Sequence, residues 1–183
     1  DAIMPHVAGG RRGEFNLRYG QPSLNAKESG GSLPPFDYDS ILARQKKRGR
    51  VPRILATNTS AEYWRGDGSL IHTDANGKLD LEPPDFARVY LFSGTQHTPG
   101  PLPPLPADPN TGSRGVHTFN LVDYAPLLRA ALVNLDRWVS DGVDPPPSAS
   151  PRLGDATAVE AESTASTFRK VPGTTFPARV VRP

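Results

Sequence analysis

Two apolar runs decide the fold of this chain: Arg53-Ile54-Leu55-Ala56 and Arg88-Val89-Tyr90-Leu91-Phe92. Each run is short and stops at a polar cluster, which is typical of a buried strand. Thr57–Trp64 follows the first run, and Ser93–His97 follows the second. Both runs therefore predict core strands that open into polar loops.

These loops carry an acid and an imidazole, Glu62 and His97. In an open α/β sheet the loops at the carboxyl ends of the strands share one edge, where ligands usually bind. We therefore expect the two side chains to meet there. A carboxylate beside an imidazole makes up two of the three members of a hydrolytic triad.

The composition predicts one globular domain with much irregular structure, since 36% of the 183 residues are hydrophobic, 22% are charged and 21 are prolines. The net charge of +2 gives no strong electrostatic case for a nucleic-acid or membrane-surface partner. The lack of cysteine excludes disulfides, a thiol nucleophile and cysteine-rich zinc sites. No apolar run approaches the roughly 18 residues that a membrane-spanning helix needs. We expect no cofactor and no metal, and the compartment stays open.

The chain begins with Asp1–Gly10, which has no initiator methionine at its start and leads directly into an apolar run, so we interpret the chain as a fragment. A strand is predicted over Ile3–Ala8, with Pro5 where no ladder bond is required. The polar residues that follow would emerge at the same sheet edge as Glu62 and His97. The candidate pocket contacts among them are Arg11, Arg12, Glu14 and Asn16, and the alternative is a surface loop whose charges pair with one another.

Residues 17–37 are rich in Pro, Ser, Gly and Asn and are predicted to form a loop or cap insertion. Asp37 or Asp39 can cap a helix that ends at Gly49, as a right-handed crossover between parallel strands requires. The basic run Arg44–Arg50 indicates a solvated helix end, although it could contact phosphate.

The prolines of residues 98–120 predict an extended segment, either one wall of a cleft or an ordinary surface crossing. A second helix should be capped at Asp123, carry Pro126 in its first turn and end at Gly142. Its apolar stripe is predicted to be core and comprises Tyr124, Leu128, Ala131, Leu132, Leu135, Trp138 and Val139. We divide the chain into a domain over residues 1–153 and a weakly structured extension over residues 154–183.

The order strand, helix, strand, acid, strand, histidine, helix resembles the C-terminal half of the α/β-hydrolase fold. The resemblance is to an uncharacterised bacterial family of α/β-hydrolase domains. It rests on Met4–Asn16, Thr57–Trp64, Ser69–Asp74, Gly94–His97 and Leu132–Pro147. It implies an α/β fold of three layers with a mostly parallel sheet, incomplete in this chain.

In such enzymes the triad follows the chain order Ser, Asp or Glu, His. The resemblance therefore implies that Glu62 is the acid and His97 the base, with the nucleophile upstream in a G-x-S-x-G elbow. Gly30-Gly31-Ser32 and Thr111–Gly115 both lack that spacing. The implied function is the acid and histidine half of a serine hydrolase acting on carboxylic esters. It would be inactive alone, because the missing N-terminal part of the same domain would supply the nucleophile.

Several alternatives stay open. Asp67 could replace Glu62 as the acid, while His6 and His117 are weaker candidates than His97. His72 and Asp74 have the spacing of a metal-ligand pair but lack a third partner nearby. A noncatalytic binding or structural domain on the same sheet is the main competing function, because fold alone does not imply function. A basic phosphate-binding protein is the third.

Overall fold

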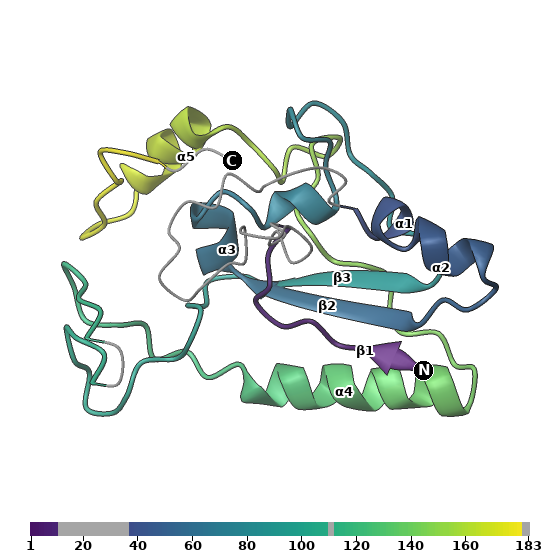
Figure 1. The fold of residues 1–183 in the computed structure, drawn as a ribbon. Coiled ribbons are helices and arrows are strands. Elements are labelled where there is room, and N and C mark those ends of the chain that lie inside the picture. The colour runs from purple at the N-terminus through teal and green to yellow at the C-terminus, as the bar shows by residue number, and fades with distance from the viewer. Residues whose placement is uncertain (11–36, 110–111, 181–183) are drawn as a thin grey trace, which may run out of the picture.

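A three-stranded parallel sheet lies at the centre of the computed structural model, which describes residues 1–10, 37–109 and 112–180. The strands are β1 (Ala2–Ile3), β2 (Arg53–Thr59) and β3 (Ala87–Phe92), in the order β1-β2-β3. Their carboxyl ends point to the same edge of the sheet (Figure 1). The predicted α/β architecture with a parallel sheet is confirmed.

Helices cover both faces of this sheet. Helices α1 (Tyr38–Ile41) and α2 (Ala43–Lys47) lie on one face, and α4 (Ala125–Ser140) lies along the other (Figure 1). Helix α3 (Ser60–Trp64) follows β2 directly at the carboxyl edge, and the short 3-10 helix η1 (Ser69–Ile71) comes next. Helix α5 (Ala161–Phe168) lies next to α3, on the side away from the sheet (Figure 1). The sheet therefore forms the middle of three layers.

Alternate residues of β2 enter two separate cores. Ile54 and Ala56 pack with Leu42 from the helical connection, whereas Leu55 packs with Leu135 and Trp138 of α4. Successive side chains of a strand point to opposite faces, so a strand buried on both faces needs an unbroken apolar run. This explains why the run of β2 can be recognised in the sequence.

Strand β2 extends beyond the apolar run that predicted it. Thr57, Asn58 and Thr59 continue the ladder with β3 and are buried, although the prediction assigned them to a loop. Burial of a polar side chain is tolerated when the group is hydrogen-bonded. Thr57 has such a bond with His6, and the Asn58 side chain accepts one from the Gly9 amide.

The first strand is shorter than predicted. The prediction of a strand over Ile3–Ala8 is wrong beyond Ile3, since only a single bridge at His6 continues the pairing with β2. Pro5 has no amide hydrogen to donate, and Val7 has a φ of +51° in the left-handed region. Both features prevent a regular ladder.

The helix predicted to end at Gly49 is divided in two at Leu42. Asp37 caps its start, because the Asp37 carboxylate accepts a hydrogen bond from the Ser40 amide at 2.9 Å. Leu42 is buried in the core while the basic residues of α2 are exposed. The crossover between β1 and β2 thus contains the expected helices. The predicted insertion over residues 17–37 lies outside the described residues except for Asp37.

Helix α4 lies within two residues of the predicted bounds, but its N-cap is Tyr124, so the prediction of Asp123 as the cap is wrong. Its buried face is also narrower than predicted. Tyr124, Ala131, Leu135 and Trp138 are buried beside it or on it. The prediction that Leu132 and Val139 are core is wrong, since they are 58% and 42% exposed. Each follows a buried residue by one position, a rotation of about 100° around the helix, which turns it away from the sheet.

The C-terminal segment contains more structure than we expected. Helix α5 forms within the region assigned to a weakly structured extension, and Phe168 and Phe176 pack against Trp64 of α3. The division at residue 153 stays a prediction. Within the described ranges, every helix is too short or too polar to cross a membrane.

Candidate active site

Glu62 is built into the start of helix α3 by a capping box. Thr59 is the N-cap, and its amide and hydroxyl both donate to Glu62 Oε2 at 2.7 Å. The pattern Thr-x-x-Glu before a helix is the sequence signature of this motif. Glu62 is fully buried, and both bonds from Thr59 go to one carboxylate oxygen, so the carboxylate cannot rotate freely.

The other oxygen of Glu62 contacts His97. Glu62 Oε1 lies 2.7 Å from His97 Nδ1, although the residues are 35 positions apart. They meet because α3 and the loop after β3 both leave the carboxyl edge of the sheet. The His97 side chain is 49% exposed, so the pair has a buried acid and an accessible imidazole.

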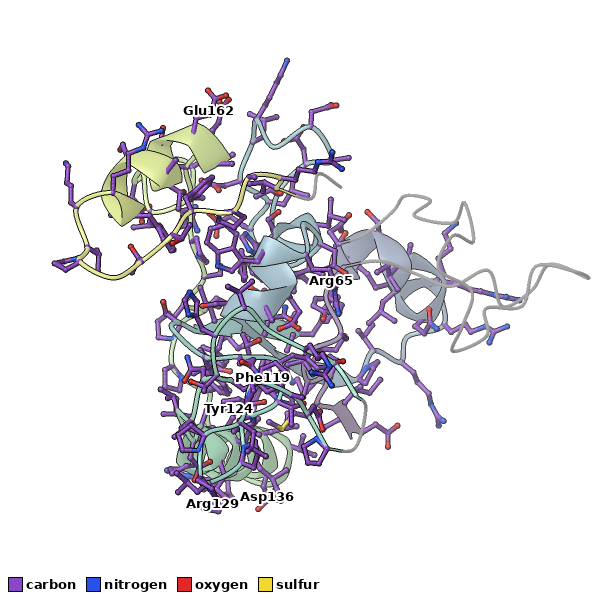
Figure 2. All side chains as sticks on the ribbon, turned by 90° about the vertical axis from the view of Figure 1, so that its left-hand side faces the viewer. Arg65, Phe119, Tyr124, Arg129, Asp136 and Glu162 are labelled. Carbon is purple, nitrogen blue, oxygen red and sulfur yellow. The ribbon has the colours of Figure 1, made fainter. Side chains whose placement is uncertain are left out.

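Contacts from the second half of the chain hold the His97 loop. The Tyr124 hydroxyl donates to the His97 carbonyl oxygen at 2.7 Å. The Asn120 side chain donates to the Gly94 carbonyl oxygen at 2.7 Å, and the Gly94 amide donates to Ser60 Oγ at 2.9 Å. Figure 2 looks onto this edge and places Tyr124 between α4 and α3. The loop is therefore fixed to both helices.

The electrostatics of the pair define the tautomer of His97. Burial by itself would raise the pKa of Glu62, but the hydrogen bonds from His97 and Thr59 outweigh burial and lower it. Glu62 is then an ionised acceptor at neutral pH, so His97 Nδ1 carries the proton and donates. The lone pair of the neutral ring is on Nε2, for which the described residues provide no hydrogen-bond partner. This nitrogen can accept a proton.

Comparison with known proteins assigns the fold to a family. A family model described as an alpha/beta hydrolase domain matches residues 1–167. The chain belongs to this family. No curated protein and no solved structure matches the chain. The resemblance to α/β-hydrolase domains and the α/β fold class are confirmed, whereas the view of the chain as the C-terminal part of such a domain stays a prediction. The match extends past residue 153 into α5.

The alternative acid, Asp67, lies elsewhere in the hydrolase domain. Its side chain is buried and pairs with Arg65, whose Nε lies 3.1 Å from Asp67 Oδ1. It also fills the space above Gly9, where an added Cβ would lie 2.6 Å from Asp67 Oδ2. Asp67 therefore supports the turn after α3, while Glu62 contacts His97.

The remaining histidines differ in burial. His72 is 3% exposed, and its Nε2 lies 2.7 Å from the Tyr63 hydroxyl. Burial lowers the pKa of His72. His117 is exposed, and His6 lies at the carboxyl edge beside Tyr124.

Neither metal nor phosphate has a clear site in the described part of the hydrolase domain. No group of three or more His, Cys, Asp or Glu side chains there could hold a metal ion. Asp74 instead accepts hydrogen bonds from the amides of its own turn. The described basic residues of the Arg44–Arg50 run are exposed, and Lys46 pairs with Asp39.

Four predicted pocket residues, Arg11, Arg12, Glu14 and Asn16, lie outside the described residues and stay predictions. Sequence reasoning missed the supports of the pair. Thr59 could have been found from its capping-box pattern. Asn120 and Tyr124 act through contacts 26 and 27 positions away, for which a single sequence carries no signal.

An aromatic cluster supports α3 from the outside. Trp64 lies 5.6 Å from Phe168 and 5.8 Å from Phe176 between ring centroids, both with edge-to-face geometry. Such pairs contribute about 0.5–1.5 kcal/mol beyond the area they bury. The C-terminal segment of the chain is thus joined to the helix that carries Glu62.

Proposed function

We propose that this hydrolase domain supplies the acid and the base of a serine hydrolase that acts on carboxylic esters. The observation that carries the proposal is the 2.7 Å contact between His97 Nδ1 and the buried, doubly anchored carboxylate of Glu62. A buried carboxylate is usually paired with a group that stays positively charged. Here the partner is a half-exposed imidazole, which is the arrangement required of a general base.

In the proposed acylation, His97 Nε2 takes the proton of a serine hydroxyl while the serine oxygen attacks the ester carbonyl carbon. Glu62 accepts the Nδ1 hydrogen bond throughout and stabilises the imidazolium that forms. The imidazolium then returns its proton to the alcohol oxygen as the carbon–oxygen bond breaks. The products are a free alcohol and an acyl-serine.

Deacylation repeats these steps with water. Nε2 takes a proton from water, the hydroxide oxygen attacks the acyl carbon, and the proton returns to the serine oxygen as the carboxylic acid leaves. Thr59 keeps Glu62 in the orientation that both halves require, because it holds Oε2 with two hydrogen bonds.

The proposed nucleophile lies outside the described residues, as do the backbone donors that would stabilise the tetrahedral oxyanion. We propose that both come from an N-terminal part of the same domain and that the 183-residue chain has no esterase activity alone. The predicted contacts of Arg11, Arg12, Glu14 and Asn16 with the substrate belong to this proposal.

The test combines a fluorophosphonate serine label with p-nitrophenyl ester turnover, applied to the 183-residue chain and to the product of its complete gene. We expect label and turnover only in the latter. There His97→Ala should lower kcat by about 10²–10⁴, the usual contribution of acid–base catalysis. His117→Ala is the matched control and should leave kcat unchanged.

Two results would overturn parts of the proposal. Turnover that persists in His97→Ala would remove His97 as the base. A label on the 183-residue chain alone would show that the chain carries its own nucleophile.

A noncatalytic binding or structural domain is the second candidate. It is favoured by the lack of any hydroxyl bonded to His97 Nε2 among the described residues. Failure of the complete gene product to take up the label or to hydrolyse any ester would make this candidate the better one.

A further inference from the structure

His6 lies beside the end of β2, the strand that leads into the Glu62 helix α3, and its ring is anchored. Its backbone bridges Thr57 in parallel pairing, and its Nδ1 lies 2.8 Å from Thr57 Oγ1. Thr57 is fully buried in β2 and cannot move without the sheet. The imidazole of His6 is therefore fixed through one of its nitrogens.

The same ring packs against Tyr124. The two ring centroids are 5.4 Å apart, and Tyr124 also contacts Phe92, with centroids 5.9 Å apart. Tyr124 is 5% exposed, and its hydroxyl donates to the His97 carbonyl oxygen. A continuous series of contacts thus leads from Thr57 through His6 and Tyr124 to the backbone of His97.

The titratable groups that face His6 are Glu62, His97 and the phenol of Tyr124. Burial lowers the pKa of His6; the Glu62 charge raises it and a charge on His97 lowers it further. His6 is accordingly neutral at pH 7. A neutral ring does not compete with His97 for the Glu62 carboxylate.

The backbone around His6 is strained. Val7 has a φ of +51°, which is unusual for a β-branched residue. Such conformations persist only where surrounding contacts hold them, and they cluster at functional sites. Here the next residues are held by the Gly9 amide on Asn58 Oδ1 and the Gly10 amide on the Asp67 carbonyl oxygen.

We infer that His6 is a positioning residue for the Glu62–His97 pair. Its anchored ring sets the position of Tyr124, and Tyr124 holds the main chain of His97 at the distance where Nδ1 reaches Glu62. The consequence for catalysis rests on the proposed function, whereas the positioning itself can be measured without any turnover.

The test is proton NMR of the 183-residue chain, which contains only four histidines, so each ring can be assigned by a single substitution. The reporter is the Nδ1 proton of His97 in its hydrogen bond to Glu62, read by its chemical shift and its exchange with water. His117→Ala, which removes an exposed histidine, is the control and should leave the signal unchanged.

We expect His6→Ala to speed the exchange of this proton by about fivefold or more, comparable to the loss of one hydrogen bond. Tyr124→Phe should do the same, because it keeps the ring but removes the hydroxyl. His6→Phe keeps a ring against Tyr124 but loses the bond to Thr57, so it should restore part of the protection.

The inference is overturned if His6→Ala and Tyr124→Phe both leave the shift and exchange of the His97 proton unchanged. If His6→Ala fails to fold, Tyr124→Phe and His6→Phe decide the question. Faster exchange in His6→Phe as large as in Tyr124→Phe would also overturn the role of ring packing.

Turnover separates this inference from the proposed function. In a gene product that hydrolyses esters, His6→Ala should lower kcat less than His97→Ala does and leave KM unchanged. If no ester is hydrolysed, the proposed function fails while the exchange measurements still decide the positioning role.

Discussion

Glu62 is fully buried on helix α3, whereas the side chain of His97 is 49% exposed on a loop that follows β3. Thr59 anchors the carboxylate within one helical turn. The loop of His97 is held by Asn120 and Tyr124, which are more than 20 positions away. Glu62 is thus positioned by local contacts and His97 by distant ones. Loss of tertiary contacts should therefore displace His97 before it displaces Glu62.

The largest effect is expected from a core substitution in α4, the helix whose N-cap is Tyr124. Leu135→Ala should destabilise the protein by about 2–5 kcal/mol, because Leu135 is 5% exposed and its loss leaves a cavity. Leu132→Ala is the control on the exposed side of the same helix and should cost less than about 0.5 kcal/mol. Urea unfolding of both variants measures the difference. Equal losses would contradict the observed orientation of α4.

The second prediction concerns Gly9, which lies against the side chain of Asp67. Gly9→Ala should cost about 2–4 kcal/mol, because Gly9 has a φ of +63° and the new Cβ would lie 2.6 Å from Asp67 Oδ2. Gly77→Ala is the matched control, with the same φ of +63° and open space around it. It should show only the backbone strain of about 1 kcal/mol. Thermal unfolding of the two variants tests whether Asp67 fills the space above Gly9.

A third experiment compares the two members of the pair directly. Glu62→Gln should cost about 1–3 kcal/mol, because the buried ionised acceptor of three hydrogen bonds is lost. His97→Gln should cost less than about 0.5 kcal/mol, since half of the side chain is exposed and glutamine can still donate to Glu62. Chemical unfolding of both variants provides the values. A larger loss for His97→Gln would reverse our view of which residue is structural.

A smaller effect is expected at the support of the His97 loop. Asn120→Ala removes side-chain hydrogen bonds to Gly94 and Val122 and should cost about 1 kcal/mol. Hydrogen exchange should increase around His97 and remain unchanged in α3. Val116→Ala, at a residue that is 96% exposed in the same segment, should alter neither. Faster exchange throughout α3 in Asn120→Ala would show that the two parts are not held independently.

The most gradual effect is that of pH. Burial lowers the pKa of His6 and His72 below 6.5, so unfolding takes up protons as the pH falls below that value. Stability should therefore decline from pH 6.5 downward. Glu62 adds a further decline below its ordinary value of 4.5, because its folded pKa is lowered too. Urea unfolding between about pH 7.5 and about pH 3 follows both declines.

Substitutions assign the two pH ranges. His6→Phe and His72→Phe should each flatten the upper decline, whereas His117→Ala should leave it in place. Stability that rises on acidification in this window would contradict the lowered pKa values of His6 and His72.

The two core strands, and the positions of Glu62 and His97 just after them, could be predicted from the sequence alone. The Arg53–Ala56 run is largely buried on both faces, and the Arg88–Phe92 run is partly or fully buried along its length. Such burial requires apolar runs that can be read directly. The shared carboxyl edge then follows from chain direction alone. The Thr59–Glu62 capping box is also a local pattern, because its hydrogen bonds join residues three positions apart.

The extent of these elements and the contacts that hold the site depend on tertiary packing. Whether Thr57–Thr59 stay in the sheet depends on partners such as His6, 51 positions from Thr57. The exposure of Leu132 depends on how α4 is rotated against the sheet, and the support of His97 depends on Tyr124. These contacts join distant residues, so their free energy depends on three-dimensional packing and not on a pattern within one segment.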